Sequence, residues 1–482
     1  MLNLSQFWTR DCQRVTRRSL LHIGTCSALG LSLPGLLAAS ARAATSASGG
    51  KARSVILLWL WGGQSHHETW DPKPNANIKI RGPFGTIPTR TPGMHISELL
   101  PQLAAVSDKY CVIRSMRHDQ KDHNVGGTVA LTGSVSGAKA SGAVPFPGTV
   151  RPSMGSLVSW LKSRPVGTAG NTPVGSGKHV AAKSDARSEW PPFMAIGPMS
   201  KVSGEFVRGQ GAGILGAARD PFRLEGDALG SGFNLPDGCT LQADLNVKRL
   251  DDRKQLLASL DRVDRQFEAS TATRRVDEFS AQAMSMLTSA AAKRALDLSS
   301  EPAAVRDRYG RTQFGQSCIL ARRLVESGVP FIQVNWSGDA EDEQQGGDGG
   351  WDLHYRLFER MHERYCPIFD RAVPALLTDL ESRGLLDSTL ILAMGEFGRS
   401  PQISSLGGRE HWPFGYSMML AGGGIRGGQL YGSSDRDGGA PADRPVHPQN
   451  IIATTLEALG LNRISLIEMG VGLDAEPVID LL

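Results

Sequence analysis

The chain has 482 residues, 40% of them hydrophobic, so it is long enough to bury the core of one large α/β domain or of two domains. Its net charge of +4 belongs to the first 43 residues, which hold five Arg and one Asp. The whole chain has 52 Lys and Arg and 48 Asp and Glu. Without residues 1–43, 47 basic and 47 acidic side chains remain. A neutral chain gives no electrostatic reason to expect nucleic acid or an anionic membrane as a partner.

The N-terminal segment has the composition of an export signal. Residues 1–43 join basic residues to an apolar stretch, Leu20 to Leu37, and a small-residue end at Ala41 to Ala43, which is typical of a cleaved signal and not of a transmembrane span. The run Thr16 to Leu21 (TRRSLL) resembles the twin-arginine signal, with an ordinary secretory signal as the alternative. We therefore predict a periplasmic or extracellular protein that has a linker at 44–53 and no transmembrane segment after the signal is removed.

Cysteine usage does not point to a disulfide scaffold or a thiolate zinc site. Two of the six cysteines fall in the signal, and the others are far apart and form no CxxC, although one disulfide bond is compatible with an oxidising compartment. These four are Cys111, Cys239, Cys318 and Cys366.

Short apolar runs alternate with helix-like segments along the chain, which predicts an α/β fold with a mostly parallel sheet. The first run, VILLWL, is continuously apolar, as expected of a strand buried on both faces. The predicted strands are Val55–Leu60, Cys111–Ile113, Phe193–Ile196, Phe331–Val334, Thr389–Met394 and Ser417–Leu420.

Two stretches have the composition of insertions. Residues 134–192 are rich in Gly, Ser and Pro, with one predicted helix at Met154 to Leu161. Residues 239–327 have Leu and Ala at helical spacing and predict two or three helices.

A further long helix is predicted over Tyr355 to Arg383, followed by Gly384 in the usual position after a helix. Pro367 and Pro374 should kink or break it.

The C-terminal third contains four residues of types that bind divalent metals. Ligands of open parallel sheets bind beyond the carboxyl ends of the strands, and Glu396 directly follows such a strand. Its alternative role is a salt bridge with Arg399. Asp352 could instead cap a helix, and His411 could be an exposed loop residue, whereas His354 has no evident structural role. The sequence thus predicts a metal site formed by Asp352, His354, Glu396 and His411.

The first predicted strand is followed by His66, His67, Glu68 and Asp71. Glu68 and Asp71 are further candidate metal ligands, because two-metal hydrolases often take a carboxylate from this place. The alternative is a turn, since a proline follows Asp71.

A third polar group follows the second predicted strand. Arg114 and Arg117 could hold a phosphate, sulfate or carboxylate through paired hydrogen bonds, with plain surface charge as the alternative. Ser115 lies between them, and His123 follows nearby.

Several ordered motifs resemble the bacterial family called domain of unknown function 1501. They are LWLWGGQSHHETWDPKP, RGPFGTI with TPGMHISELLP, VIRSMRHD with HNVGGTVALTG, GWDLH, RGLLDSTLILAMGEFGRSP, GREHWPFGYSMMLAGGGIRGGQLYG and IIATTLEALGL. The resemblance implies a relationship to the alkaline phosphatase and sulfatase superfamily, hence a three-layer sandwich over residues 54–482 with helices on both faces. It also implies metal-assisted cleavage of phosphate or sulfate esters, with His411 and the pair Asp352 and His354 in ligand positions.

The chain departs from the superfamily pattern at the place of the nucleophile. Sulfatases place a Cys or Ser about ten residues before a Leu-Thr-Gly, and His123 stands at that distance from Leu131 to Gly133 here. His123 could be a nucleophile or a metal ligand, Ser115 could take over, a metal-activated water could attack, or ester cleavage could be lost.

Two functions follow from this reading. The first is an exported hydrolase of a phosphate or sulfate ester that uses zinc, calcium or manganese, with Arg114, Ser115 and His123 as catalytic candidates. The second is a non-catalytic protein that keeps the fold to bind an anionic glycan or a protein partner.

Overall fold

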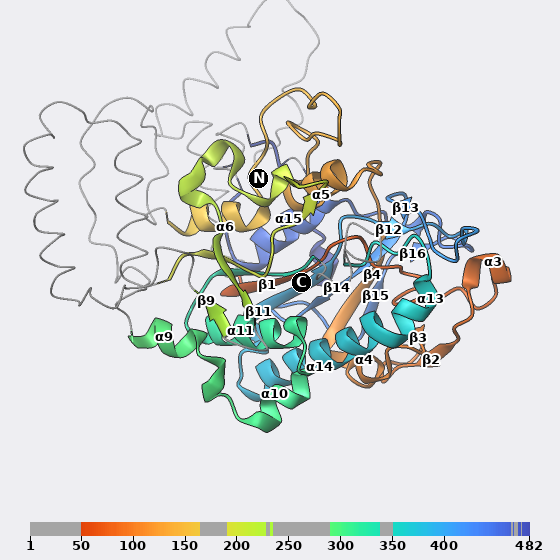
Figure 1. Cartoon of the computed structure of the whole chain (residues 1–482), viewed down its shortest axis with the longest axis horizontal. Coiled ribbons are helices and arrows are strands. Elements are labelled where there is room, and N and C mark those ends of the chain that lie inside the picture. Colours follow the sequence, from red (N-terminus) through yellow and green to blue (C-terminus); the bar gives the residue numbers. More distant parts are fainter. Residues whose placement is uncertain are drawn as a thin grey trace, which may run out of the picture. The chain divides into compact units, whose positions relative to one another are not determined.

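A nine-stranded sheet runs through the described part of the chain in the order β15-β4-β14-β11-β1-β10-β5-β8-β9 (Figure 1). Neighbouring strands are parallel except where β14 meets β11 and β4 and where β9 meets β8, so seven strands share one direction. The mostly parallel sheet predicted from the sequence is confirmed. The strands are β1 (Ser54–Leu60), β4 (Tyr110–Met116), β5 (Phe193–Ile196), β8 (Phe222–Asp227), β9 (Gly232–Asn234), β10 (Phe331–Trp336), β11 (Thr389–Met394), β14 (Tyr416–Ala421) and β15 (Gln429–Tyr431).

The computed structural model describes residues 50–163, 190–227, 232–234, 290–337, 350–463, 466, 471–473 and 475–482. The expected signal at 1–43 and most of the linker lie outside the described residues. So do residues 164–189 of the loop-rich stretch and 239–289 of the helical stretch.

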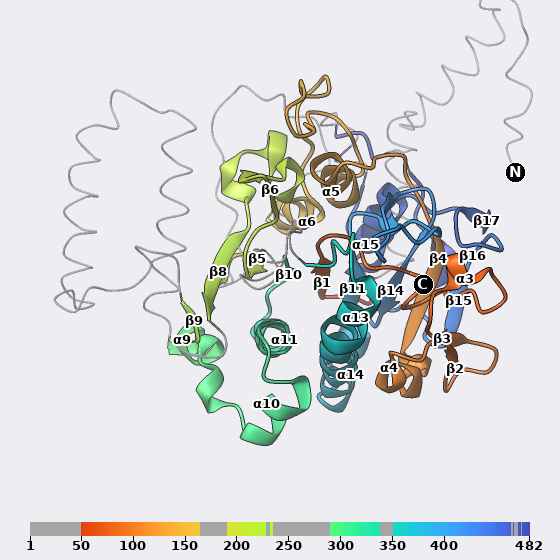
Figure 2. The same ribbon diagram turned by 45° about the vertical axis from the view of Figure 1, so that its right-hand side comes forward.

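Helices cover both faces of the sheet and make the fold a three-layer α/β sandwich (Figure 2). All seven residues of β1 are buried, and successive side chains point to opposite faces. Ile56 and Leu58 pack with one group of helices, and Leu57 and Trp59 with the other. The first group is α4 (Pro101–Ala105), α9 (Ala290–Leu296), α10 (Ala303–Tyr309), α11 (Gln313–Glu326) and α14 (Cys366–Ser382), and the second is α5 (His123–Thr132), α6 (Met154–Lys162) and α15 (Pro448–Ala458).

The predicted helix at Tyr355 to Arg383 is present but divided. It comprises α13 (Leu357–Arg360), a π-helical turn at Met361–Tyr365, and α14. Pro367 is the second residue of α14, where a helix needs no N–H, so the division falls at this proline. Pro374 lies inside α14 without ending it, and Gly384 follows the helix with a φ of 67°. Of the two expectations for Pro374, a kink or a break, the structure therefore excludes the break.

All six predicted strands and the helix at Met154 to Leu161 are present in the structure. The short strands β8, β9 and β15 were not predicted, because they are brief or rich in polar residues. Small two-stranded sheets complete the fold: β2 (Thr86–Pro88) with β3 (His95–Ser97), β6 (Lys201–Val202) with β7 (Glu205–Phe206), β12 (Gly398–Arg399) with β13 (His411–Trp412), and β16 (Ser433–Ser434) with β17 (Pro441–Asp443).

Three of the four cysteines beyond the signal are described, and each is a buried free thiol: Cys111, Cys318 and Cys366. Cys239 lies outside the described residues. Among the helices that the structure describes, none has the length and apolar character needed to cross a membrane.

Candidate metal centre

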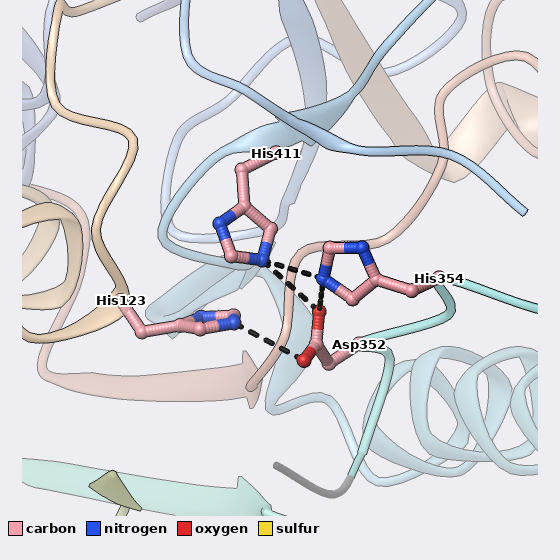
Figure 3. Close-up of side chains that lie close together, drawn as sticks. All are labelled: His123, Asp352, His354 and His411. Carbon is pink, nitrogen blue, oxygen red and sulfur yellow. Dashed lines mark hydrogen bonds and ion pairs between the residues drawn. The ribbon is translucent and has the colours of Figure 1, made fainter. Parts of the chain in front are cut away.

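Side chains from three separate segments meet beyond the carboxyl ends of the central strands (Figure 3). His123 is the first residue of α5, whose start is capped by the Asp122 carboxylate accepting from the Val125 amide at 3.1 Å. Asp352 and His354 lie on the segment between β10 and α13, and His411 begins β13. This edge is where open parallel sheets bind their ligands.

Four ligand atoms of these residues lie within 4.8 Å of one another. Nε2 of His354 is 2.9 Å, and Nε2 of His411 is 3.2 Å, from Oδ1 of Asp352. Nε2 of His123 is 3.3 Å from the other carboxylate oxygen, Oδ2. We call these residues the His3Asp cluster.

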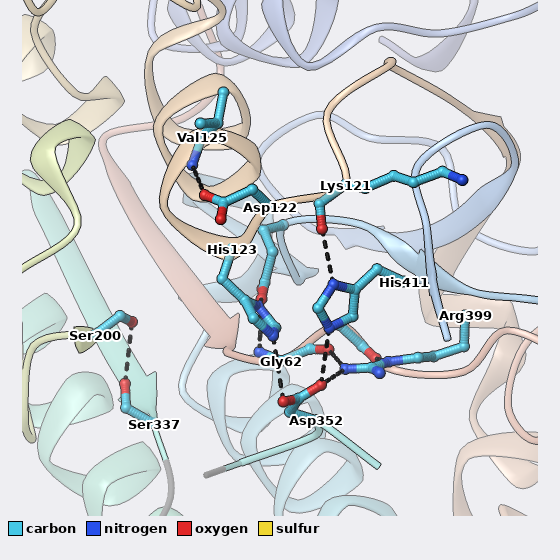
Figure 4. Close-up of polar contacts among 12 residues, drawn as sticks. Gly62, Lys121, Asp122, His123, Val125, Ser200, Ser337, Asp352, Arg399 and His411 are labelled. Atoms are coloured by element: carbon cyan, nitrogen blue, oxygen red, sulfur yellow. Dashed lines mark hydrogen bonds and ion pairs between the residues drawn. The ribbon is translucent and has the colours of Figure 1, made fainter. Parts of the chain in front are cut away.

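Each imidazole of the cluster is held from its outer side by an oxygen at Nδ1. The partners are Glu396 Oε1 for His123 at 2.6 Å, Glu410 Oε2 for His354 at 2.9 Å, and the backbone carbonyl of Lys121 for His411 at 2.8 Å. Figure 4 shows the Lys121 contact. Each Nδ1 therefore donates its proton outward, and a neutral ring turns a bare Nε2 inward.

These tautomers make the cluster suited to a cation. Nε2 of His354 and Nε2 of His411 are only 2.9 Å apart, so in the neutral rings two lone pairs face each other. Nε2 of His123 is buried and has no hydrogen-bond partner. A divalent cation among the three nitrogens would remove both the repulsion and the unsatisfied atom, so these residues fit a metal.

Protonation in the metal-free cluster follows from burial and charge. Burial would lower the pKa of His123, but the neighbouring carboxylates of Asp352 and Glu396 outweigh burial and raise that pKa to about 9. Burial would likewise raise the pKa of Asp352, yet Arg399 and the three imidazoles hold it well below its usual range. The pKa of His411 is lowered, chiefly by burial. A metal would have to displace the His123 proton, so its binding should weaken in acid.

Arg399 anchors the carboxylate of the cluster (Figure 4). Its guanidinium is fully buried and pairs with Asp352 Oδ1. The same side chain donates to the backbone carbonyls of Gly62, of Gly63 at 3.2 Å and of Arg409 at 3.1 Å. Most of its N–H donors are used by these backbone carbonyls and by Asp352. Arg399 therefore positions Asp352 and links three loops.

Gly62 lies shortly after β1, where the chain passes close to the cluster. Its φ is 97°, and a Cβ there would lie 2.2 Å from the Asp352 amide nitrogen. Its own N–H donates to both carboxylate oxygens of Glu396, at 2.9 and 3.1 Å. Only glycine allows the chain after β1 to pass this close to the cluster.

The structure places Glu396 beside the cluster and not among its four members. Its carboxylate is fully buried and joins His123 to Gly62. Arg399, considered as its salt-bridge partner, pairs with Asp352 instead. Asp352 does not cap a helix, because α13 begins after Arg356, whose side chain makes no capping bond.

The other predicted ligands have different partners. Glu68 forms a buried ion pair with Arg409, at 2.6 Å between Oε1 and a guanidinium nitrogen. Asp71 pairs with Lys73 at 3.0 Å and with Arg114 at 3.4 Å. Neither carboxylate belongs to the described metal-binding group.

Two of the predicted catalytic residues also point elsewhere. Arg114 donates to the backbone carbonyls of Trp70 and His95, at 2.9 and 2.6 Å. The Ser115 hydroxyl donates to the Arg444 carbonyl at 2.6 Å. Of the catalytic candidates, only His123 lies in the cluster, and its sequence context did not distinguish a nucleophile from a metal ligand.

Fold and site together define an α/β protein with a His3Asp cluster, a candidate metal site, at the carboxyl edge of a mostly parallel sheet. The family model described as "Protein of unknown function (DUF1501)" matches residues 52–477, so the chain belongs to that family. No curated protein matches the chain.

Solved structures with partial likeness include two named hydrolases. The PsFucS1 sulfatase from Pseudoalteromonas sp. is 13% identical, with 89% of this chain and 72% of that chain covered and a TM-score of 0.33. The phosphonate monoester hydrolase of Agrobacterium radiobacter is 12% identical, with 89% and 77% covered and a TM-score of 0.31. Ps i-CgsB in complex with k-i-k-neocarrahexaose is 11% identical, with 88% and 74% covered and a TM-score of 0.37. Scores this low do not bear on what this chain binds or cleaves.

Proposed function

We propose that this protein is an exported hydrolase that binds a divalent transition-metal ion at the His3Asp cluster and cleaves a phosphate or sulfate ester. The observation that carries the proposal is the convergence of three imidazole Nε2 atoms and one carboxylate within 4.8 Å, each ring fixed at Nδ1. The sequence motifs resemble the DUF1501 family, and the relationship to the phosphatase and sulfatase superfamily that this resemblance implies supports the ester class.

The donor set favours zinc or manganese over calcium. Imidazole nitrogen suits zinc and related transition metals, whereas calcium takes roughly six to eight oxygen ligands. Only one of the four ligand residues of the cluster offers oxygen.

Residues around the cluster fix the orientation of its three histidine rings. Glu396, Glu410 and the Lys121 carbonyl retain the Nδ1 protons, so the rings cannot rotate without losing a hydrogen bond. The side chains of His354 and His411 are 31% and 22% exposed, while Asp352 is buried, so an ester would approach from the side of the two histidines. A bound divalent ion would supply Lewis-acid activation of the ester oxygen and of an attacking water.

A water nucleophile agrees best with these contacts. Among the described residues, no Ser, Thr or Cys side chain bonds to a side chain of the cluster, and Ser115 donates to a distant carbonyl. The same observation favours the second candidate function, a non-catalytic protein that binds an anionic glycan. Turnover of an ester separates the two.

Metal content and turnover of the exported protein test the proposal. We expect about one zinc or manganese ion per chain by mass spectrometry of the metal. We also expect hydrolysis of at least one of p-nitrophenyl sulfate, p-nitrophenyl phosphate and bis(p-nitrophenyl) phosphate. His411→Ala should abolish both without changing the circular dichroism spectrum. His95→Ala is the matched control, because His95 is exposed on β3.

A wild-type protein that folds but binds no divalent metal would overturn the metal site. Metal binding without turnover of any ester would favour the glycan-binding alternative. Export is tested separately: we propose that Arg17→Lys with Arg18→Lys retains the full-length chain in the cytoplasm, and secretion of that variant would contradict the twin-arginine assignment.

A further inference from the structure

A cavity lies next to the chain segment that contacts the metal cluster. It has a volume of about 640 Å³ and is lined by the segment Arg117 to Gln120, the end of α5, and the start of α15. This volume is in the range of small-ligand sites. None of its lining residues belongs to the His3Asp cluster.

A single stretch of chain, Arg117 to Lys121, separates the cavity from the metal cluster. His118 and Gln120 line the cavity, and the carbonyl of the next residue, Lys121, accepts from His411. His118 also contacts the Glu396 carbonyl through Nε2 at 2.6 Å. The cavity is therefore a neighbour of the metal cluster and not its entrance.

The charged side chains of the cavity favour an anion. Arg117 and Arg151 line it, and Asp119 is its one acidic lining residue. Arg117 is exposed and has no hydrogen-bond or ion-pair partner for its side chain among the described residues, whereas Arg151 is fixed by donating to the Gly472 carbonyl. Arginine presents paired donors that match sulfate and phosphate oxygens.

The start of α15 adds positive potential at the same place. His447 and Pro448, the N-cap and first residue of this 11-residue helix, line the cavity. The positive end of the helix dipole favours a negative group there. Gly133 lets α5 end against this helix, since a Cβ on it would lie 2.8 Å from Gln449 Cβ.

The remaining lining combines an aromatic ring with amides and a hydroxyl. Phe146 is a large hydrophobic side chain left 37% exposed, and it lines the cavity with Gln120, Ser134 and Gln449. One apolar face with a few polar groups is the usual composition of a site for an organic ligand, not for a bare ion.

We infer that this cavity binds a saccharide that carries a sulfate or phosphate group, with Arg117 and Arg151 on the anionic group and Phe146 against the sugar ring. The site is separate from the metal cluster and does not depend on ester hydrolysis. The cavity would bind such a ligand whether or not the His3Asp cluster hydrolyses its ester.

Calorimetric titration of the full mature chain with glucose 6-sulfate tests the inference. Arg117→Ala should weaken binding roughly tenfold or more, because it removes a charge-assisted pair of hydrogen bonds. Arg90→Ala is the control: it removes the same charge from an Arg that is 65% exposed and outside the cavity, and it should leave the affinity unchanged. Binding should persist in His411→Ala, which disables the metal cluster.

Titrations with inorganic sulfate and glucose separate the parts of the ligand. We expect sulfate alone to bind more weakly than the sulfated sugar, and glucose not to bind measurably. Equal affinity for sulfate and glucose 6-sulfate would overturn the saccharide part. Loss of binding in His411→Ala but not in Arg117→Ala would overturn the site itself, as would no binding by the wild type.

Discussion

Glu68 and Arg409 form a buried ion pair whose removal should destabilise the fold without removing the metal. The guanidinium is fully buried and donates to Glu68 through Nε and a terminal nitrogen, at 3.0 and 2.6 Å. It also donates to the carbonyls of Ile80 at 2.7 Å and Ser400 at 3.0 Å. The pair thus joins the segment after β1 to the loop before β13.

The loss of unfolding free energy depends on which charged side chain is left buried without its partner. Arg409→Met leaves the Glu68 carboxylate buried, with the Ser65 hydroxyl as its remaining hydrogen-bond donor. Breaking a buried pair from one side costs about 3–5 kcal/mol of unfolding free energy. Glu68→Gln should cost less than Arg409→Met, because the guanidinium keeps its carbonyl acceptors and the amide can still accept from it.

Urea denaturation with a chelator present measures this cost without a contribution from bound metal. The double variant should be less destabilised than the sum of the two single variants, since it leaves no lone buried charge. Arg356→Met is the control: its pair with Glu359 is exposed on both sides, so the loss should be at most about 1 kcal/mol. If Glu68→Gln left stability unchanged but lowered metal content, Glu68 would be a ligand and this reasoning would be wrong.

Three further predictions concern the cluster and its surroundings. Glu410→Ala should weaken zinc binding about 10- to 100-fold by releasing His354, measured by chelator competition; unchanged affinity would contradict an orienting role. Burial lowers the pKa of His66 to about 4, below its unfolded value of about 6.5, so its contribution to stability is present above pH 6.5 and is lost as the pH falls through 4. His66→Gln should therefore reduce the loss of unfolding free energy between pH 7.5 and 4 by about 3 kcal/mol, and an unchanged pH profile would refute this. Gly62→Ala should destabilise the protein and lower its metal content together, because the added Cβ collides with the backbone of Asp352; wild-type values for both would exclude that clash.

The sequence by itself determined the layers of the fold. Continuous apolar runs such as Val55 to Leu60 predict strands buried on both faces, because a strand with one solvated face alternates apolar and polar residues. Gly384 likewise marked the end of α14 through a backbone conformation that other residues avoid. These signals are local, so one sequence suffices to find them.

The sequence also identified three members of the cluster, Asp352, His354 and His411, as residues of metal-binding type. It could not separate them from Glu68 and Asp71, which have the same chemistry and a similar place after a strand. That distinction depends on which basic side chain lies nearest to each carboxylate: Arg409, which pairs with Glu68, lies 341 positions away in the sequence, and Arg114, which contacts Asp71, comes from β4.

Only the tertiary structure decided how the site is assembled. His123, Asp352 and His411 are brought together by the packing of α5, the segment after β10, and β13, which local propensity does not encode. The same packing gives each imidazole an oxygen at Nδ1 and so turns its Nε2 toward a common point. Ligand type is a property of the residue, whereas convergence is a property of the folded chain.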